Sequence, residues 1–190
     1  MDRRRFADLS LKTGIVAAVA AAIPGVATLR GRTRAAASQE VAEGDRLVFA
    51  LGQNANQPVT EGSFTQNEAV LAFPEGKTDN HDNLVLVCKL NPAMLQAPTD
   101  LEGAAGGVVV YSAICTHLGC TVRFSEEPMD MAPFPHIHCP CHAALFDPHR
   151  GGVVMGGPAP RPLPQLPVRL NERAEIIVVG NFTGPVGVTA

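Results

Sequence analysis

Residues 107–120 read G-V-V-V-Y-S-A-I-C-T-H-L-G-C, an apolar run that leads directly into a loop of cysteine and histidine. The first part, Gly107–Ile114, is rich in β-branched residues, which favour β-strands. Runs of the same character recur along the chain at Arg46–Leu51, Glu68–Phe73, Leu84–Leu90, Val153–Met155, Leu166–Leu170 and Ala174–Val179. Residues 125–137 hold two prolines around Phe134 and are expected to form an irregular insertion. No stretch after residue 40 keeps a helical period, so the sequence predicts an all-β, mostly antiparallel domain.

The composition is typical of a globular β-protein, and the distribution of charge argues against one class of binding partner. The 190 residues are 46% hydrophobic and 17% charged, with 18 glycines, 16 prolines and no tryptophan. So many turn-forming residues favour short strands joined by loops over a helical bundle. Residues 1–34 carry seven basic and two acidic side chains, whereas residues 35–190 carry eight basic and sixteen acidic ones. A domain this acidic argues against a nucleic-acid partner.

Residues 1–37 have the features of an export signal, which leaves residues 38–190 as the folded domain. The basic start Arg3-Arg4-Arg5-Phe6 resembles a twin-arginine signal, with Asp2 where Ser or Thr is usual. The apolar run Gly14–Leu29 has 16 residues, whereas a membrane-spanning helix needs about 20. Ala35-Ala36-Ala37 offers a cleavage site. Cleavage and retention as an N-terminal anchor helix both remain open.

Four of the five cysteines fall in two short clusters that also contain histidine. The first cluster is Cys115-Thr116-His117-Leu118-Gly119-Cys120 and the second is Cys139-Pro140-Cys141-His142. Thiolate and imidazole together suit zinc or an iron–sulfur cluster. Two cysteines and two histidines would complete a two-iron cluster, with one cysteine of each loop left to pair. A closed zinc site and a plain pair of disulfides are the alternatives. The fifth cysteine, Cys88, stands in an apolar run and is expected to be a buried thiol.

A third motif follows these two clusters. C-T-H-L-G-C, then C-P-C-H, then the proline-rich run Gly157–Pro164 together resemble the Rieske iron–sulfur protein family. The likeness is greatest to the high-potential branch found in cytochrome bc complexes. It implies a Rieske-type antiparallel β-sandwich with a small inserted cluster-binding subdomain at about residues 113–164. The motifs cover residues 115–164, and the similar layout extends from about residue 84 to the end of the chain.

The resemblance implies a role for each motif residue in binding one Rieske-type [2Fe-2S] cluster. Cys115 and Cys139 would bind the buried iron, and His117 and His142 the outer iron. Cys120 and Cys141 would form a disulfide between the two loops. The residues expected to shield the cluster from water are Leu118, Gly157, Pro158 and Pro160. The histidines outside the matched positions, His136, His138 and His149, are interpreted as loop or surface residues.

The resemblance also implies a function in respiratory electron transfer. In such a protein His142 accepts a hydrogen bond from the hydroxyl of a quinol, with His117 as the weaker candidate. The electron then passes to a c-type cytochrome in a complex with cytochrome b, on the periplasmic face of the bacterial membrane. The iron–sulfur subunit is thus the electron-transfer component of a quinol–cytochrome c oxidoreductase. The N-terminal segment would hold it to the membrane if uncleaved.

Two positions depart from the high-potential pattern. The second loop usually continues Gly-Ser-x-Tyr, but here Ala144 and Phe146 replace the Ser and the Tyr. Neither can donate a hydrogen bond to sulfur, and this loss destabilises the more negative reduced cluster. We therefore expect a potential in the lower part of the range of about −150 to +300 mV. Such a potential suits menaquinol better than ubiquinol.

Two other functions fit the same motifs. The first is the Rieske small subunit of a periplasmic molybdenum oxidase, such as arsenite oxidase, which touches no quinone. The second is a zinc- or disulfide-stapled binding module without redox activity.

Overall fold

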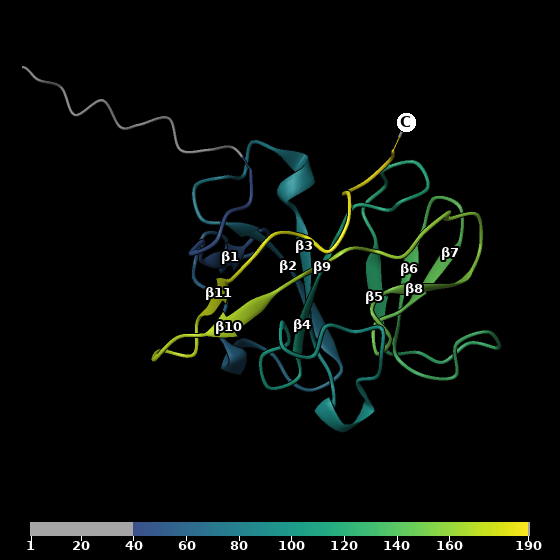
Figure 1. The fold of residues 1–190 in the computed structure, drawn as a ribbon, viewed down its shortest axis with the longest axis horizontal. Coiled ribbons are helices and arrows are strands. Elements are labelled where there is room, and N and C mark those ends of the chain that lie inside the picture. The colour runs from purple at the N-terminus through teal and green to yellow at the C-terminus, as the bar shows by residue number, and fades with distance from the viewer. Residues whose placement is uncertain (1–39, 190) are drawn as a thin grey trace, which may run out of the picture. The chain divides into compact units, whose positions relative to one another are not determined.

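The computed structural model describes residues 40–189, which fold into antiparallel sheets (Figure 1). The predicted export signal, its cleavage site and the anchor helix lie outside these residues. The largest sheet has the order β1-β2-β3-β4-β9. Its strands are β1 (Leu47–Phe49), β2 (Glu68–Pro74), β3 (Val85–Lys89), β4 (Val108–Ser112) and β9 (Gln165–Leu166). Within residues 40–189 no helix is long and apolar enough to cross a membrane.

Two smaller sheets and three short 3-10 helices complete the described chain. The four-stranded sheet consists of β5 (Arg123–Ser125), β6 (His136–Cys139), β7 (Ala144–Asp147) and β8 (Val153–Gly156), in that order. The two-stranded sheet pairs β10 (Val168–Leu170) with β11 (Ile176–Val178). The 3-10 helices are η2 (Glu61–Ser63), η3 (His81–Asn83) and η4 (Pro92–Met94).

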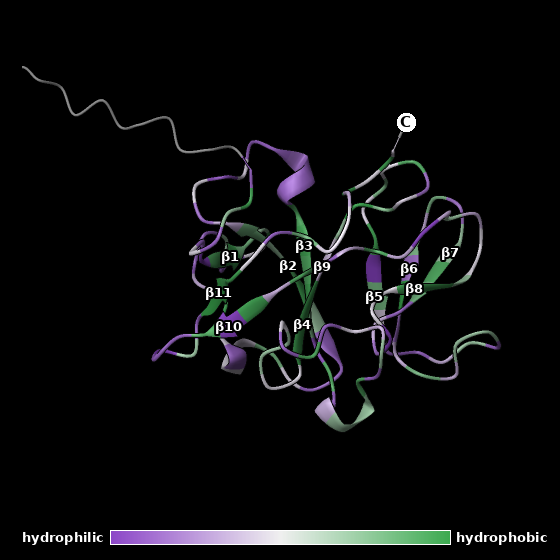
Figure 2. Ribbon diagram, viewed as in Figure 1, coloured by the Kyte–Doolittle hydropathy of each residue, from purple (hydrophilic) through white to green (hydrophobic). Residues whose placement is uncertain are grey.

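The central strands β3 and β4 are buried on both faces, which explains their continuous apolar sequence (Figure 2). Side chains alternate along a strand. Val85 and Val87 therefore belong to a core shared with β10 and β11, whereas Leu86 and Cys88 belong to a second core. This second core includes Phe146 of β7, together with Cys115 and Cys139. The large sheet is thus the layer against which the cysteine–histidine loops pack.

The four-stranded sheet is an insertion between two paired strands of the large sheet. β4 and β9 are neighbours, with Val110 opposite Leu166 and Tyr111 opposite Gln165. The chain between them is residues 113–164. Hydrogen bonds fasten it at its two ends, because the Ser112 amide donates to the Pro164 carbonyl at 2.9 Å. The Tyr111 hydroxyl also donates to the Pro148 carbonyl at 2.8 Å.

The predicted all-β, antiparallel fold is confirmed, and every expected run contains a strand. The run Leu166–Leu170 is interrupted at Pro167, which has no amide hydrogen to donate, and it divides between β9 and β10. Three strands of the inserted sheet, β5, β6 and β7, were not predicted. The expected irregular insertion is shorter than residues 125–137, since β5 ends at Ser125 and β6 begins at His136.

Candidate metal centre

The first loop leaves β4 and closes on itself through the backbone. The Cys115 amide donates to the Cys120 carbonyl at 2.8 Å, and the Gly119 amide donates to the Cys115 carbonyl at 3.0 Å. Gly119 adopts a φ of +78°, in the left-handed region that glycine enters without strain. The loop therefore turns back sharply, with Cys115 at its buried base and Leu118 exposed at its tip.

The second loop is the tight connection between β6 and β7. Cys139 pairs with Ala144 across these strands, and the Ala143 amide donates to the Cys139 carbonyl at 3.0 Å. Pro140, Cys141, His142 and Ala143 are exposed, whereas Cys139 is 1% exposed. Ala143 has a φ of +55°, which is unfavourable for a residue with a Cβ atom. The hairpin thus presents His142 at the surface and holds Cys139 inside.

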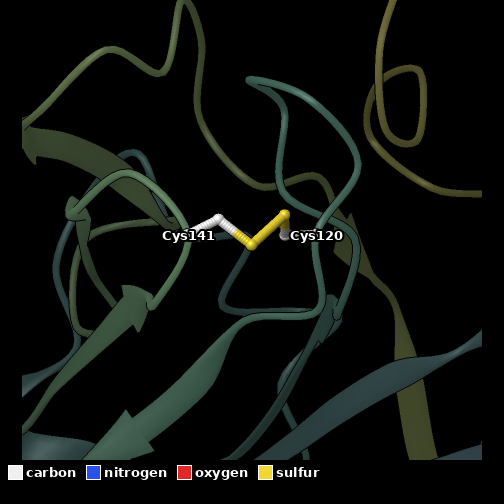
Figure 3. Close-up of a disulfide and its surroundings, with 2 residues drawn as sticks. All are labelled: Cys120 and Cys141. Atoms are coloured by element: carbon white, nitrogen blue, oxygen red, sulfur yellow. A yellow bond between two sulfur atoms is a disulfide. The ribbon is translucent and has the colours of Figure 1, made fainter.

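A disulfide between Cys120 and Cys141 joins the two loops (Figure 3). This is the pairing that the resemblance implied. The two Cα atoms are 6.6 Å apart and the residues are separated by 21 positions in the chain. A bridge over a loop of this size stabilises the fold by about 3 kcal/mol on the chain-entropy model.

The remaining loop cysteines are free thiols on the inner side of this bridge. Cys115 is 0% exposed, and its thiol interacts electrostatically with that of Cys139. Burial raises the pKa of the Cys115 thiol, while backbone amides of His117 and Leu118 that donate to its sulfur lower it. The sulfur of Cys139 also lies within 4.8 Å of both disulfide sulfurs. The two loops therefore place two unpaired thiols side by side in an apolar setting. Cys88, the predicted core thiol, is also free and fully buried.

The two loop histidines lie together on the outer side. The ring centroids of His117 and His142 are 4.7 Å apart in an edge-to-face arrangement. The Nδ1 atom of His117 is buried and has no hydrogen-bond partner. A buried nitrogen without a partner is costly, and a metal ion would satisfy it. Two inner thiols and two outer imidazoles are a donor set that fits a two-iron cluster with mixed ligands.

The proline-rich segment is packed against the second loop. A Cβ atom on Gly157 would lie 2.5 Å from the Ala143 carbonyl oxygen and 2.6 Å from the Ala144 Cα atom, so only glycine permits this approach. The first loop is also fastened here, because the Thr116 hydroxyl donates to the Arg161 carbonyl at 2.7 Å. Of the residues expected to shield a cluster, Leu118 is 59% exposed, and Gly157, Pro158 and Pro160 are exposed as well.

Arg161 connects this segment to the end of the described chain. Its guanidinium group donates to the carbonyl groups of Pro185 and Gly187. Gly187 in turn lies close to Ile114, at the start of the first loop. The residues after β11 therefore form part of the support for the metal centre. Neither Arg161 nor this segment was singled out from the sequence, because no local pattern marks contacts across more than twenty residues.

The sequence pattern of the Rieske [2Fe-2S] domain matches residues 32–167. The chain belongs to the Rieske [2Fe-2S] family. A cytochrome bc1 complex Rieske iron–sulfur subunit from Streptomyces lividans is 30% identical over 145 residues, covering 72% of this chain and 82% of that protein. A putative respiratory nitrate reductase subunit Rieske from Haloferax mediterranei is 31% identical over 191 residues, covering 98% of this chain and 80% of that protein.

Longer Rieske subunits and a solved structure are also similar. A bc1 Rieske subunit from Corynebacterium glutamicum is 38% identical over 109 residues, which cover 55% of this chain and 26% of that protein. The soluble domain of the Rieske protein II from Sulfolobus acidocaldarius is 26% identical, with a TM-score of 0.43 over 55% of this chain and 64% of that chain. The cofactor of this Rieske protein is a [2Fe-2S] cluster.

His136 is neither a loop nor a surface residue as interpreted from the sequence, and His149 lies in a turn but is buried. His136 on β6 is 2% exposed and His149, after β7, is 5% exposed. His149 is held by Asp147, whose Oδ1 atom is 3.4 Å from its Nδ1 atom. His138 is half-buried on β6. His136 is buried and His138 half-buried because both lie on β6, a strand that was not foreseen.

Proposed function

We propose that Cys115 and Cys139 bind one iron of the [2Fe-2S] cluster and that His117 and His142 bind the other. The burial of both free thiols and the electrostatic interaction between them support the first pair. The second pair is supported by the 4.7 Å distance between the rings and by the unpartnered His117 Nδ1. Leu118, Gly157, Pro158 and Pro160 would then screen the centre from water. The Cys120–Cys141 disulfide holds both loops in register.

When bound, such a cluster supplies a one-electron carrier whose potential is raised by its neutral histidine ligands. The protein contributes an asymmetric setting for it. Both cysteines are buried, His117 is half-buried and His142 is exposed. His142 is therefore the side chain placed to meet an electron donor and to accept a proton on the ring nitrogen that does not bind metal. This exposure of His142 is the observation on which the proposed function rests.

We infer that the donor is a quinol and that the chain is the iron–sulfur subunit of a quinol–cytochrome c oxidoreductase. Its partners are then cytochrome b and a c-type cytochrome. The bc1 relatives support this assignment. Ala144 and Phe146 are both 0% exposed and have no hydroxyl group, which favours a low potential and menaquinol as donor. The export features of residues 1–37 would place the domain on the periplasmic face, anchored or released.

The second candidate is the Rieske subunit of an enzyme that contains a separate catalytic subunit. The Haloferax relative supports it, since its alignment covers 98% of this chain, compared with 72% for the Streptomyces lividans relative. In this case His142 faces a protein partner and not a quinol. A periplasmic molybdenum oxidase belongs to the same class of assembly.

The ligand assignment is tested by EPR and iron analysis of the purified full-length holoprotein at two pH values about two units apart. We expect two irons per chain and a Rieske-type signal on reduction. The midpoint should fall as pH rises, because metal charge favours loss of the remaining imidazole proton in the oxidised state. A zinc-containing, EPR-silent protein, or a midpoint independent of pH, would contradict histidine ligation.

The partner is tested by purifying the tagged full chain from detergent-solubilised membranes of its own cells. The bc assignment predicts stoichiometric haem b and quinol-dependent reduction of cytochrome c in the purified complex. A complex without haem b that instead reduces nitrate with an artificial electron donor would favour the second candidate. As a matched control, the same preparation is made from the variant Cys139→Ser, which removes one proposed ligand and should abolish quinol-dependent reduction of cytochrome c.

A further inference from the structure

A second group of metal-ligating side chains lies beside the Rieske centre, on strand β6. His136 and His138 are two residues apart, so both side chains leave the same face of the strand. Their ring centroids are 6.0 Å apart. They line a cavity of about 300 Å³ together with Glu127 and Cys139. None of the roles assigned to the Rieske centre uses these two histidines.

Each of the two rings offers a nitrogen atom to a ligand. The Nδ1 atom of His136 lies 3.2 Å from the Phe134 carbonyl oxygen, to which it donates when protonated. This contact fixes the tautomer in which the Nε2 lone pair is available, the arrangement that commonly supports a metal-bound histidine. The Nδ1 atom of His138 is buried and has no hydrogen-bond partner. Two imidazoles of this kind are a chelating pair for a borderline-soft divalent ion.

We propose that His136, His138 and Glu127 form a second metal site that binds Zn²⁺ or a similar divalent transition-metal ion. Glu127 supplies the carboxylate, from the segment between β5 and β6. In the described residues, the nitrogen and carboxylate atoms of these three side chains do not all lie within 4.8 Å of one another. Closing the site thus requires rotation of the half-buried His138 ring and of the exposed Glu127 side chain.

The charged side chains around the site determine how tightly it binds a cation. Arg123 lies opposite His138 in the β5–β6 pair, and its positive charge opposes a bound cation. Glu126 and Glu127 follow at the end of β5 and offset that charge. Replacing Arg123 with Gln should therefore tighten binding of Zn²⁺, whereas Glu127→Gln should weaken it. The opposite signs of these two exposed-residue variants separate a specific site from loss of folding.

A cation at this site would act on the Rieske centre, a consequence that rests on the proposed role of Cys139 as a ligand. His138 and Cys139 are adjacent in the chain, and both line the cavity. Reduction makes the cluster more negative, so the reduced protein should bind Zn²⁺ more tightly than the oxidised protein. By reciprocity, saturating Zn²⁺ raises the midpoint potential. A tenfold difference in affinity corresponds to a rise of about 59 mV for one electron.

The test is titration of the intact holoprotein with Zn²⁺ by calorimetry, with iron content measured before and after. We expect one Zn²⁺ per chain, at least tenfold weaker binding in His138→Gln and in His136→Gln, and no change in the control His81→Gln. His81 is an exposed histidine of η3, outside the cavity. Equal binding by the His138 and His136 variants would overturn the proposal and place the ion elsewhere, for example on His142.

A second measurement tests whether Zn²⁺ bound at this site affects the midpoint potential of the Rieske centre. The midpoint potential is titrated with and without Zn²⁺ in the wild type and in His138→Gln. A rise that is confined to the wild type supports the coupling. Zn²⁺ binding that depends on His138 but leaves the midpoint potential unchanged would contradict the coupling through Cys139. The same result would support the proposed metal site. Absence of Zn²⁺ binding to an intact, EPR-active holoprotein would refute the second site without affecting the assignment of the Rieske centre.

Discussion

Replacing Gly157 with alanine should loosen the metal centre more than any other single methyl group added to the loops. The added Cβ atom would meet the Ala143 carbonyl oxygen at 2.5 Å and the Ala144 Cα atom at 2.6 Å, far inside ordinary contact. Gly157 also has a φ of +82°, which costs an L-residue about 1–2 kcal/mol. Overpacking against backbone adds about 1–3 kcal/mol. The expected loss of about 2–5 kcal/mol is a large part of the 5–15 kcal/mol typical of a folded domain.

A second glycine separates the two contributions. Gly76 has a φ of +73°, and a Cβ atom there would have nothing within 4 Å. Gly76→Ala should therefore show only the cost of about 1–2 kcal/mol for the backbone conformation. Unfolding of both holoproteins in urea is followed by far-ultraviolet circular dichroism and by loss of the visible absorption of the cluster. Gly157→Ala should lose the cluster at lower urea than Gly76→Ala. Equal behaviour of the two variants would refute the close packing of the proline-rich segment on the second loop.

Three further perturbations test separate parts of the structure. Removing the disulfide with Cys120→Ala and Cys141→Ala should destabilise the domain by about 3 kcal/mol in urea unfolding, and reductant should then have no additional effect. Ala143→Gly should raise the free energy of unfolding by about 0.5–1 kcal/mol, because relief of the left-handed φ exceeds the cost of the added entropy of the unfolded chain. Thermal unfolding measures this change, and a melting temperature below that of the wild type would contradict the expectation. Hydrogen bonds from Arg173 hold the pKa of Glu175 below its ordinary value, so its carboxylate stabilises the fold above the unfolded pKa and loses this effect as pH falls through the folded pKa. Glu175→Gln should therefore be less stable than the wild type at neutral pH, with a gap that closes in acid, as measured by urea midpoints across pH.

The sequence predicts the strands whose stability comes from their own composition. β3 and β4 are apolar on both faces because both faces are buried, and their valine-rich runs indicate strands without any knowledge of neighbours. β5, β6 and β7 were missed for the opposite reason. β6 alternates His-Ile-His-Cys over only four residues, and β7 is an apolar run of three residues that ends at Asp147, so both patterns are too short to indicate a strand on their own. Pairing with neighbouring strands and packing on the large sheet, not local propensity, hold these residues extended.

The same distinction between local sequence patterns and contacts of distant residues applies to the site. Cys115, His117, Cys139 and His142 could be selected from sequence because short spacing between ligand types is itself the signal. The need for glycine at position 157 arises from contact with Ala143, which is fourteen residues away along the chain. The support that Arg161 gives to the first loop depends on how the last residues return from β11. Neither effect leaves a pattern in the neighbouring residues, so only the structure identifies them.

The attachment of the inserted subdomain limits how the Rieske centre can reach two partners. Residues 113–164 begin and end at paired strands, and the Ser112–Pro164 and Tyr111–Pro148 hydrogen bonds hold the insertion to β4. The disulfide and the Gly157 contact then fix both loops to each other and to the proline-rich segment. We infer that the centre cannot move independently of the large sheet. If electron donor and acceptor occupy different positions, residues 40–189 must travel between them as one body, with His142 leading at the exposed tip.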